Sequence, residues 1–423
     1  MSTAFKYCAV NEATVYESVT PTGKGKKPVN KILMGTYVTI VEEKEEWYKV
    51  KTAGPDGWMH ADQLSDDMGL KIFYLDVGQG DGVLIEAGNY KILIDAGPSD
   101  NMFNYLTKWQ YKYLLDDNKK IHIDYLIVSH FDQDHYKGFI KILGHAGFTF
   151  GQICHAGILK FASSENTYNT GLGDTIQKGG ITYLTTIFDN LLTIEEPVPF
   201  NRDITAFLNQ LEKAKVENRV QKAKRLGQGE TIIKKTIEGK PFKLEVLAPF
   251  IEKVSNKKVY VYWKDDGKTI NGHSLVVKLS FGNRSFLFAG DLNSLSENYL
   301  IEKYENENPF EVDVAKSCHH GSSDFTETFM ALVNPYASVI SSGDNETFSH
   351  PRADAVGCAG KYSKGTRPLV FSTELARSTD LKNKKILYGM INCRCNGDKI
   401  YMSQMKEAST NTDLWDSYEI KNE

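Results

Sequence analysis

Six consecutive residues in the first third of the chain include four potential metal ligands. His130, Asp132, Asp134 and His135 stand within this segment, which follows directly on the apolar residues 123–128. Two imidazoles and two carboxylates this close together are hard to explain as packing. Their alternation lets a loop direct two side chains at one ion and the next two at another. Zinc accepts such a mixture of nitrogen and oxygen ligands, and manganese or iron would tolerate it. The segment therefore predicts a divalent metal site rather than a polar surface turn.

Further candidate ligands occur far downstream, each after an apolar, strand-like segment. They are Asp291, the adjacent pair His319 and His320, and finally, beyond Asn345, His350. Taken singly each signal is weak, because a carboxylate at a strand end is commonly a turn residue. Together they repeat one geometry, in which polar side chains leave the same edge of a sheet, where α/β folds place their sites. The set predicts one shared centre.

The elements that must position these side chains are predicted from short apolar segments and glycine-rich turns. Residues 70–77 are a predicted strand that ends in the glycine loop 78–82, and residues 83–86 and 91–95 are two more strands around the hairpin signal Gly88-Asn89. Strand-like and helical segments then alternate along the rest of the chain. This mixture predicts an α/β layered fold rather than a helical bundle or an all-β sandwich.

Residues 1–67 differ from the rest of the chain. Their apolar pieces are short, rich in aromatic and β-branched residues and separated by polar turns, which predicts a small all-β barrel. The succession Met34-Gly35-Thr36, a strand at Trp47 and Gly57-Trp58-Met59 resembles bacterial SH3-type domains. We therefore expect an SH3-like barrel over 1–67 and a second domain over 68–423. The resemblance implies a module that binds a protein or peptide, and a purely structural appendage is the alternative.

Composition excludes some classes of protein and leaves others open. The 423 residues carry a formal net charge of -4, which excludes a globally basic nucleic-acid binder. The segment 213–243, however, holds ten Lys or Arg against three Glu, an excess that could attract a polyanion such as a phosphodiester substrate. A solvated helix face is the alternative interpretation of this basic segment. Its basic residues are Lys213, Lys215, Arg219, Lys222, Lys224, Arg225, Lys234, Lys235, Lys240 and Lys243.

Cysteine usage and hydropathy predict the compartment. The six cysteines are irregularly spaced and suggest no disulfide framework, which favours a reducing environment. The first ten residues contain no apolar core long enough for secretion, and no stretch of about 18 apolar residues occurs to span a membrane. The expectation is a soluble, cytoplasmic protein without a membrane partner.

Several segments, in order, resemble the metallo-β-lactamase superfamily, whose members are metal-dependent hydrolases with an αββα sandwich. Within it, the likeness is greatest to the hydrolase domain of ComEC-type competence proteins and to related phosphodiesterases, and it spans about residues 69–405. The segments that carry it are Asp76-Val77-Gly78-Gln79-Gly80-Asp81, Leu93-Ile94-Asp95-Ala96-Gly97, Ser129 through Gly138, Phe288-Ala289-Gly290-Asp291 and His319-His320-Gly321-Ser322. The resemblance implies an αββα metallo-β-lactamase sandwich behind the small all-β SH3-like barrel.

The resemblance also implies two divalent metal ions, zinc first and manganese as the alternative. His130 and Asp132 would hold one ion, Asp134 and His135 would hold the other, and Asp291 would bridge the pair. The implied reaction is hydrolysis by water that the two ions activate, and Asp134 is counted among the catalytic residues.

Three histidines complete the expected site. One of the adjacent His319 and His320 would be a further ligand; we assign the ligand role to His319 and a substrate-facing, catalytic role to His320. For the leaving group, His350 is the first candidate proton donor and His320 the second. His273 is interpreted with equal weight as a ligand and as an ordinary strand residue. Cys318, beside the paired histidines, is expected near the site as a supporting group or an adventitious ligand.

Three functions are weighed on this basis. The leading prediction is a phosphodiesterase or nuclease acting on nucleic acid or a nucleotide, which the basic segment would help to bind. The second keeps the metal site but cleaves a carboxylic ester, lactone or other small molecule, because one fold hosts many chemistries. The third is a catalytically inactive sandwich whose N-terminal barrel recruits a partner.

Overall fold

Two large sheets face each other at the centre of the computed structural model, which describes residues 4–163, 167–194, 198–343, 348–374 and 391–421. Between the sheets lies one continuous apolar cluster, in which Ile72 and Ile85 of the first sheet share a core with Leu244, Val277 and Phe286 of the second. Strands buried on both faces explain why the segments read as nearly unbroken apolar runs.

The first sheet has nine strands in the order β15-β12-β11-β10-β9-β8-β25-β26-β27. Strands β10, β11, β12 and β15 run parallel to one another, and the remaining neighbours pair antiparallel. The strands are β8 (Leu70–Tyr74), β9 (Gly82–Ala87), β10 (Tyr90–Ala96), β11 (Ile121–Ile127), β12 (Phe148–His155), β15 (Ala223–Arg225), β25 (Ile391–Cys395), β26 (Ile400–Thr410) and β27 (Asp413–Ile420).

The second sheet has seven strands in the order β16-β17-β20-β21-β22-β23-β24. Its first half is an antiparallel meander, whereas β21, β22, β23 and β24 run parallel. The strands are β16 (Thr231–Ile237), β17 (Lys240–Ala248), β20 (Val276–Phe281), β21 (Arg284–Phe288), β22 (Val314–Lys316), β23 (Ala337–Ile340) and β24 (Leu369–Ser372).

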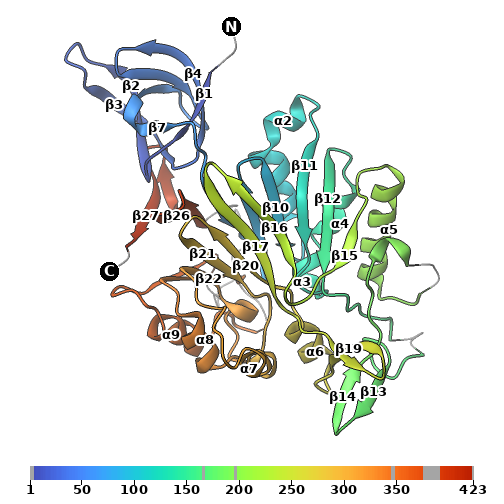
Figure 1. The fold of residues 1–423 in the computed structure, drawn as a ribbon. Helices are drawn as coiled ribbons and strands as arrows, with labels where there is room; N and C mark the ends of the chain where they lie inside the picture. Colours follow the sequence, from blue (N-terminus) through green and yellow to red (C-terminus); the bar gives the residue numbers. More distant parts are fainter. Residues whose placement is uncertain (1–3, 164–166, 195–197, 344–347, 375–390, 422–423) are drawn as a thin grey trace.

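Helices cover the outer face of each sheet (Figure 1). One outer core joins the first sheet to the helices around Met102, Phe139 and Phe207, and another joins the second sheet to Leu300 and Phe329. The four layers are therefore helix, sheet, sheet, helix, which confirms the predicted αββα fold class. The helices are α1 (Asn101–Tyr105), α2 (Lys112–Asp116), α3 (Gln133–Tyr136), α4 (Phe139–Gly144), α5 (Arg202–Val216), α6 (Asp266–Gly272), α7 (Ser294–Lys303), α8 (Glu327–Val333) and α9 (Ala353–Lys361).

The N-terminal segment forms a separate seven-stranded sheet, which agrees with the all-β expectation for this segment. All its pairings are antiparallel, and its core is small, with Val15, Val38 and Val50 at the centre. The SH3-like likeness and the boundary at residue 67 stay predictions. The strands are β1 (Phe5–Cys8), β2 (Glu12–Val19), β3 (Gly25–Leu33), β4 (Tyr37–Lys44), β5 (Trp47–Lys51), β6 (Gly57–His60) and β7 (Leu64–Ser65).

Hydrogen bonds attach this sheet to the sandwich. The Glu238 carboxylate accepts the backbone N–H groups of Met68 and Gly69 at 2.8 and 2.9 Å, and the Lys31 N–H donates to the Asn411 carbonyl at 2.9 Å. A small fourth sheet lies at the opposite end of the sandwich and contains β13 (Thr175–Lys178), β14 (Ile181–Leu184), β18 (Glu252–Val254) and β19 (Lys257–Val261). Within the described ranges, every helix is too short or too polar to cross a bilayer.

Candidate metal centre

The predicted ligands follow strands that end at the same edge of the sandwich. Residues 129–135 follow β11 of the first sheet, whereas Asp291 follows β21 and the pair His319 and His320 follows β22, both of the second sheet. Because β21 and β22 are parallel neighbours, their carboxyl ends meet at one edge. Each sheet thus contributes part of one cluster, whereas the sequence pattern predicts the edge of a single sheet.

Four side chains form the tightest part of the cluster. The Nε2 atoms of His135 and His320 lie 3.2 Å apart, and they lie 3.2 and 3.0 Å from Asp291 Oδ2. Asp134 Oδ2 is 3.3 Å from His320 Nε2. Two imidazole nitrogens and two carboxylates that converge on one point are a nitrogen and oxygen donor set suited to zinc or manganese.

A second group of predicted ligands adjoins the first. The His130 ring centroid is 4.1 Å from that of His135, and His319 Nε2 is 4.0 Å from Asp291 Oδ2. Asp132 forms an ion pair with Lys160. Asp291 Oδ2 therefore lies within 4.0 Å of a ring nitrogen of His135, His320 and His319. The structure places Asp134, His135, Asp291 and His320 in direct contact and His130 and His319 beside them, whereas the printed contact of Asp132 is with Lys160; the role of each in metal binding stays a prediction.

Buried partners orient the two central imidazoles. His135 Nδ1 lies 2.9 Å from Asp95 Oδ2, and Asp95 also accepts the backbone N–H and the hydroxyl of Ser129. His320 Nδ1 lies 3.0 Å from the Ser341 carbonyl oxygen, which can only accept, so this nitrogen carries a proton. Both rings therefore direct Nε2 toward Asp291, which is how outer partners orient metal-binding histidines.

The charges of the cluster are strongly coupled. Burial alone would raise the pKa of Asp291, but His135 and His320 lower it well below its usual range. Burial lowers the pKa of His130 well below its ordinary value and keeps this ring neutral, as metal binding requires. Burial opposes the protonation of His135 and His320, yet Asp291 raises the pKa of both well above the ordinary value.

The residues present fit a divalent cation. Asp291 Oδ1 and His319 Nδ1 are buried and, in the part of the chain that the structure describes, neither takes part in a hydrogen bond. Buried polar atoms are normally satisfied, so such atoms within a crowded donor set indicate a missing partner. Asp81, His135, Asp291 and His320 each offer one ligand atom within 4.8 Å of the others.

The two adjacent histidines lie the other way round from the roles assigned to them on sequence, in which His319 was the ligand and His320 faced the substrate. His320, 1% exposed, belongs to the tight cluster, whereas the side chain of His319 is 25% exposed and lies farther from Asp291. Both residues adopt left-handed backbone conformations, with φ of 47° and 54°. This local turn decides which ring reaches the cluster, and no spacing rule reveals it.

His273 occupies a different place from the one that a ligand role requires. Its Nε2 lies 2.7 Å from the Val261 carbonyl oxygen, and its ring stacks on Trp263 with centroids 4.6 Å apart. The next residue, Ser274, reaches the site instead: its hydroxyl lies 3.2 Å from His130 Nδ1 and accepts the Asp291 N–H at 3.1 Å. The structure thus favours the packing interpretation of His273.

His350 lies beside the cluster, with its ring centroid 5.9 Å from that of His319 and 6.3 Å from that of His320. Its Nδ1 is 3.3 Å from Gln79 Nε2, whose amide is oriented by a bond from the Gly343 N–H to Gln79 Oε1. Since an amide nitrogen donates, His350 Nδ1 accepts, and the proton of the neutral ring lies on Nε2. Asn345 lies outside the described residues.

The glycine loop after β8 contributes more to the site than the sequence indicated. Asp81 N–H donates to the Asp134 carbonyl at 3.2 Å. A Cβ atom on Gly80, whose φ is +130°, would lie 2.1 Å from the same oxygen, so only glycine permits this approach. Asp81 and Lys316, an ion pair inside the cluster, are residues that sequence reasoning missed as site residues.

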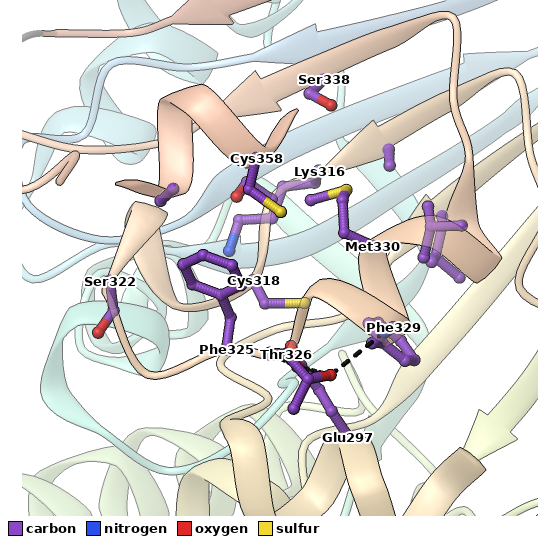
Figure 2. A pocket seen from close by; sticks show the side chains of 15 residues that line it. Glu297, Lys316, Cys318, Ser322, Phe325, Thr326, Phe329, Met330, Ser338 and Cys358 are labelled. Atoms are coloured by element: carbon purple, nitrogen blue, oxygen red, sulfur yellow. Dashed lines mark hydrogen bonds between the residues drawn. The ribbon is translucent and has the colours of Figure 1, made fainter. Parts of the chain in front are cut away.

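Cys318 lines a small cavity of about 30 Å³ beside β22 and α8, together with Phe325, Met330 and Cys358 (Figure 2). Burial raises the pKa of the Cys318 thiol well above its ordinary value, which keeps it protonated. The Cys318 thiol thus faces this mostly apolar cavity. The predicted supporting position near the histidines is therefore compatible with the structure, whereas a ligand role gains no support.

Local ion pairs engage much of the basic segment 213–243. Its first part belongs to α5 and its later part to β15, β16 and β17. Six of its ten basic residues pair with acidic groups, and the side chains of Arg219 and Arg225 are 3% and 8% exposed. Lys234 and Lys235 are exposed on β16, an edge strand. Lysines on an edge discourage pairing with other chains, which is a structural reason for part of this charge.

The four-layer fold is of the metallo-β-lactamase type, and the cluster is a candidate metal site. A family model described as the Metallo-beta-lactamase superfamily matches residues 75–152. Among curated proteins, "ComE operon protein 3" of Bacillus subtilis (strain 168) is 30% identical over 99 residues, which cover 23% of this chain and 12% of that protein. The chain therefore matches only a small part of this relative.

Solved structures with similar folds were also found. YhfI from Bacillus subtilis, a metallo-beta-lactamase fold protein, has a TM-score of 0.36 at 11% identity, with 72% of this chain and 96% of that chain covered. Igni18, a metallo hydrolase from Ignicoccus hospitalis KIN4/I, has a TM-score of 0.36 at 14% identity, with 75% and 100% covered. Likenesses at these scores add nothing about the site.

Proposed function

We propose that the protein is a metal-dependent phosphodiesterase that acts on nucleic acid or a nucleotide. The observation that carries this proposal is the convergence of Asp134, His135, Asp291 and His320 on one point, with His130 and His319 beside them. Two ions held by such a set supply Lewis acidity and a water of lowered pKa, the chemistry that hydrolases of phosphate esters use.

We assign the predicted ligands to two sets, one for each ion. Asp134, His135 and His320 would hold one ion. His130, Asp132 and His319 would hold the other. Lys160, which forms an ion pair with Asp132, lies at the edge of the site, and its side chain is 33% exposed. An ammonium at this edge supports an anionic substrate, because it can pair with a non-bridging phosphate oxygen.

His350 is the proposed proton donor to the leaving oxygen. Gln79 donates to its Nδ1, which leaves the proton of the neutral ring on Nε2. A ring whose tautomer is set by a fixed partner does not have to reorient before it donates. His320, the second candidate, already directs Nε2 at Asp134 and Asp291 and is better suited to bind metal.

The test is a comparison of hydrolysis rates between the wild-type protein and His130→Ala, Asp134→Ala. Both are loaded with Mn²⁺ or Zn²⁺ and assayed on DNA, RNA, bis(p-nitrophenyl) phosphate and a p-nitrophenyl carboxylic ester. Metal-dependent cleavage of a phosphodiester that the double variant has lost supports the proposal. Metal-dependent cleavage of the carboxylic ester alone would instead establish the small-molecule hydrolase, and no bound metal would favour a binding module.

Two further parts of the prediction stay proposals. The N-terminal sheet is proposed to bind a protein or peptide, and the protein is proposed to act in the cytoplasm. A pull-down with residues 68–423 deleted is not informative, because the isolated sheet has not been shown to fold. Crosslinking of the full chain in cells, followed by identification of peptides joined to strands β1 to β7, tests the first proposal.

A further inference from the structure

A buried lysine and a buried carboxylate lie inside the candidate metal centre without a place in the proposed reaction. Lys316 ends β22 and forms an ion pair with Asp81, and their side chains are only 2% and 4% exposed. Lysine is seldom buried to this degree, because removal of its ammonium from water is costly unless it is paired. The position of this pair suggests why it is present.

The lysine contacts the segment that carries the bridging carboxylate. Lys316 Nζ donates to the carbonyl of Gly290 at 3.2 Å and lies 3.8 Å from Asp291 Oδ1. The ammonium therefore stands between the Asp81 and Asp291 carboxylates and offsets the repulsion between them. It also fixes the backbone directly before Asp291.

The aspartate contacts the segments that carry two other ligands. Its Oδ1 lies 3.2 Å from His320 Nδ1, on the side of the ring opposite to Nε2. Its backbone N–H donates to the carbonyl of Asp134 at 3.2 Å, where Gly80 permits the close approach. One ion pair thus touches the segments of three proposed ligands, which follow three different strands.

We propose that Lys316 and Asp81 are positioning residues that hold Asp134, Asp291 and His320 in metal-binding geometry before the metal arrives. The inference rests on the metal site of the proposed function. It predicts that the pair contributes to metal affinity through arrangement of the ligands and not only through the stability of the fold.

Three variants and one control test this inference: Lys316→Met, Asp81→Asn, the double variant, and Lys71→Met. Lys71 forms a comparably buried ion pair with Glu86, with side chains 11% and 8% exposed, outside the metal cluster. For each protein the measurements are metal content, affinity for Zn²⁺ by chelator competition, the visible spectrum of the Co²⁺ form and the thermal midpoint of the metal-free form.

Each single site variant should bind Zn²⁺ about 10- to 100-fold more weakly, the usual effect of removing a group that orients a ligand. The double variant removes both charges and should regain much of the thermal stability, but its Zn²⁺ affinity should stay at least about tenfold below that of the wild type. Its Co²⁺ spectrum should differ from that of the wild type. Lys71→Met should lose stability and keep both the affinity and the spectrum.

Several results would overturn the inference. Full Zn²⁺ affinity in the double variant would show that each residue only neutralises the charge of the other and does not position the ligands. Loss of an ion in Asp81→Asn together with full affinity in Lys316→Met would make Asp81 a ligand itself. If Lys316→Met does not fold, the Zn²⁺ affinities of Asp81→Asn and of the double variant still test the positioning role. Absence of metal from the wild type would refute the proposed function first, so the two failures are distinguishable.

Discussion

Because of the buried ion pair between Lys71 and Glu86, we expect the free energy of unfolding of the sandwich to fall at acid pH. The two residues are direct partners on β8 and β9, the strands that flank the glycine loop, and their charged atoms lie 2.6 Å apart. Tyr111 also donates its hydroxyl to Glu86 at 2.7 Å. Burial by itself would raise the pKa of Glu86, but Lys71 and Tyr111 lower it to about 2.

The size of the effect follows from this pKa. A fall from the ordinary value of 4.5 to about 2 corresponds to about 3 kcal/mol, at 1.36 kcal/mol for each tenfold change in proton affinity. Because the pKa of Glu86 is depressed in the folded state, this contribution is present above pH 4.5 and is lost as the pH falls toward 2. Burial lowers the pKa of Lys71, so the ammonium opposes folding and reduces the net value of the pair.

The variant Glu86→Gln tests this reasoning. It leaves the Lys71 ammonium buried without its partner and should lower the free energy of unfolding by about 3–5 kcal/mol at pH 7. Urea unfolding of the metal-free protein, followed by fluorescence from pH 7 to pH 3, should show the difference from wild type shrinking below pH 4.5. The double variant Glu86→Gln, Lys71→Met should recover most of the stability at pH 7. A difference that stays constant across this pH range would refute the assignment.

Three further predictions concern the site and its surroundings. We assign the rings of His320 and His319 to different ions, so the variants His320→Ala and His319→Ala should each contain about half as much metal as the wild type. Plasma mass spectrometry measures the metal content. A full metal content in either variant would contradict the assignment. Gly80→Ala places a Cβ atom against the Asp134 carbonyl and should cost roughly 1–3 kcal/mol in unfolding experiments and weaken metal binding. If DNA lies along β16, the double variant Lys234→Glu, Lys235→Glu should reduce the slope of log affinity for duplex DNA against log salt concentration by about 2. Turnover of the small substrate bis(p-nitrophenyl) phosphate should stay unchanged. An unchanged slope would exclude DNA binding along this strand.

The layered fold and the location of the site were predictable for a physical reason. Buried parallel strands need long apolar runs, and the residues just beyond those runs must lie at one edge of a sheet. His130 through His135 and Asp291 satisfy both conditions in the printed sequence alone. Each therefore lies at the end of a buried strand, but their meeting in one cluster also requires the two sheets to pack against each other, which the family resemblance implies and the local pattern does not.

The details that sequence did not predict all depend on tertiary contacts or local backbone angles. His273 and Ser274 are neighbours, and only the end of α6 decides that the serine faces His130. Lys316 stands in an apolar strand where a lysine looks like an exposed residue, and its burial is intelligible only once Asp81 is placed beside it. The charge excess of segment 213–243 was visible, but partners such as Asp189 for Arg225 were not.

The candidate centre also depends on the packing of the two sheets against each other. His135 follows a strand of the first sheet, whereas Asp291 and His320 follow strands of the second, and these three side chains meet within 3.2 Å. Neither sheet alone holds the full donor set, so the site exists only when the apolar surfaces between the sheets are in register. Metal bound there would crosslink the two halves of the sandwich and add its binding free energy to folding. The Lys316 and Asp81 pair spans the same junction, which is why its proposed role requires both the Zn²⁺ affinity and the thermal midpoint of the metal-free form to be measured.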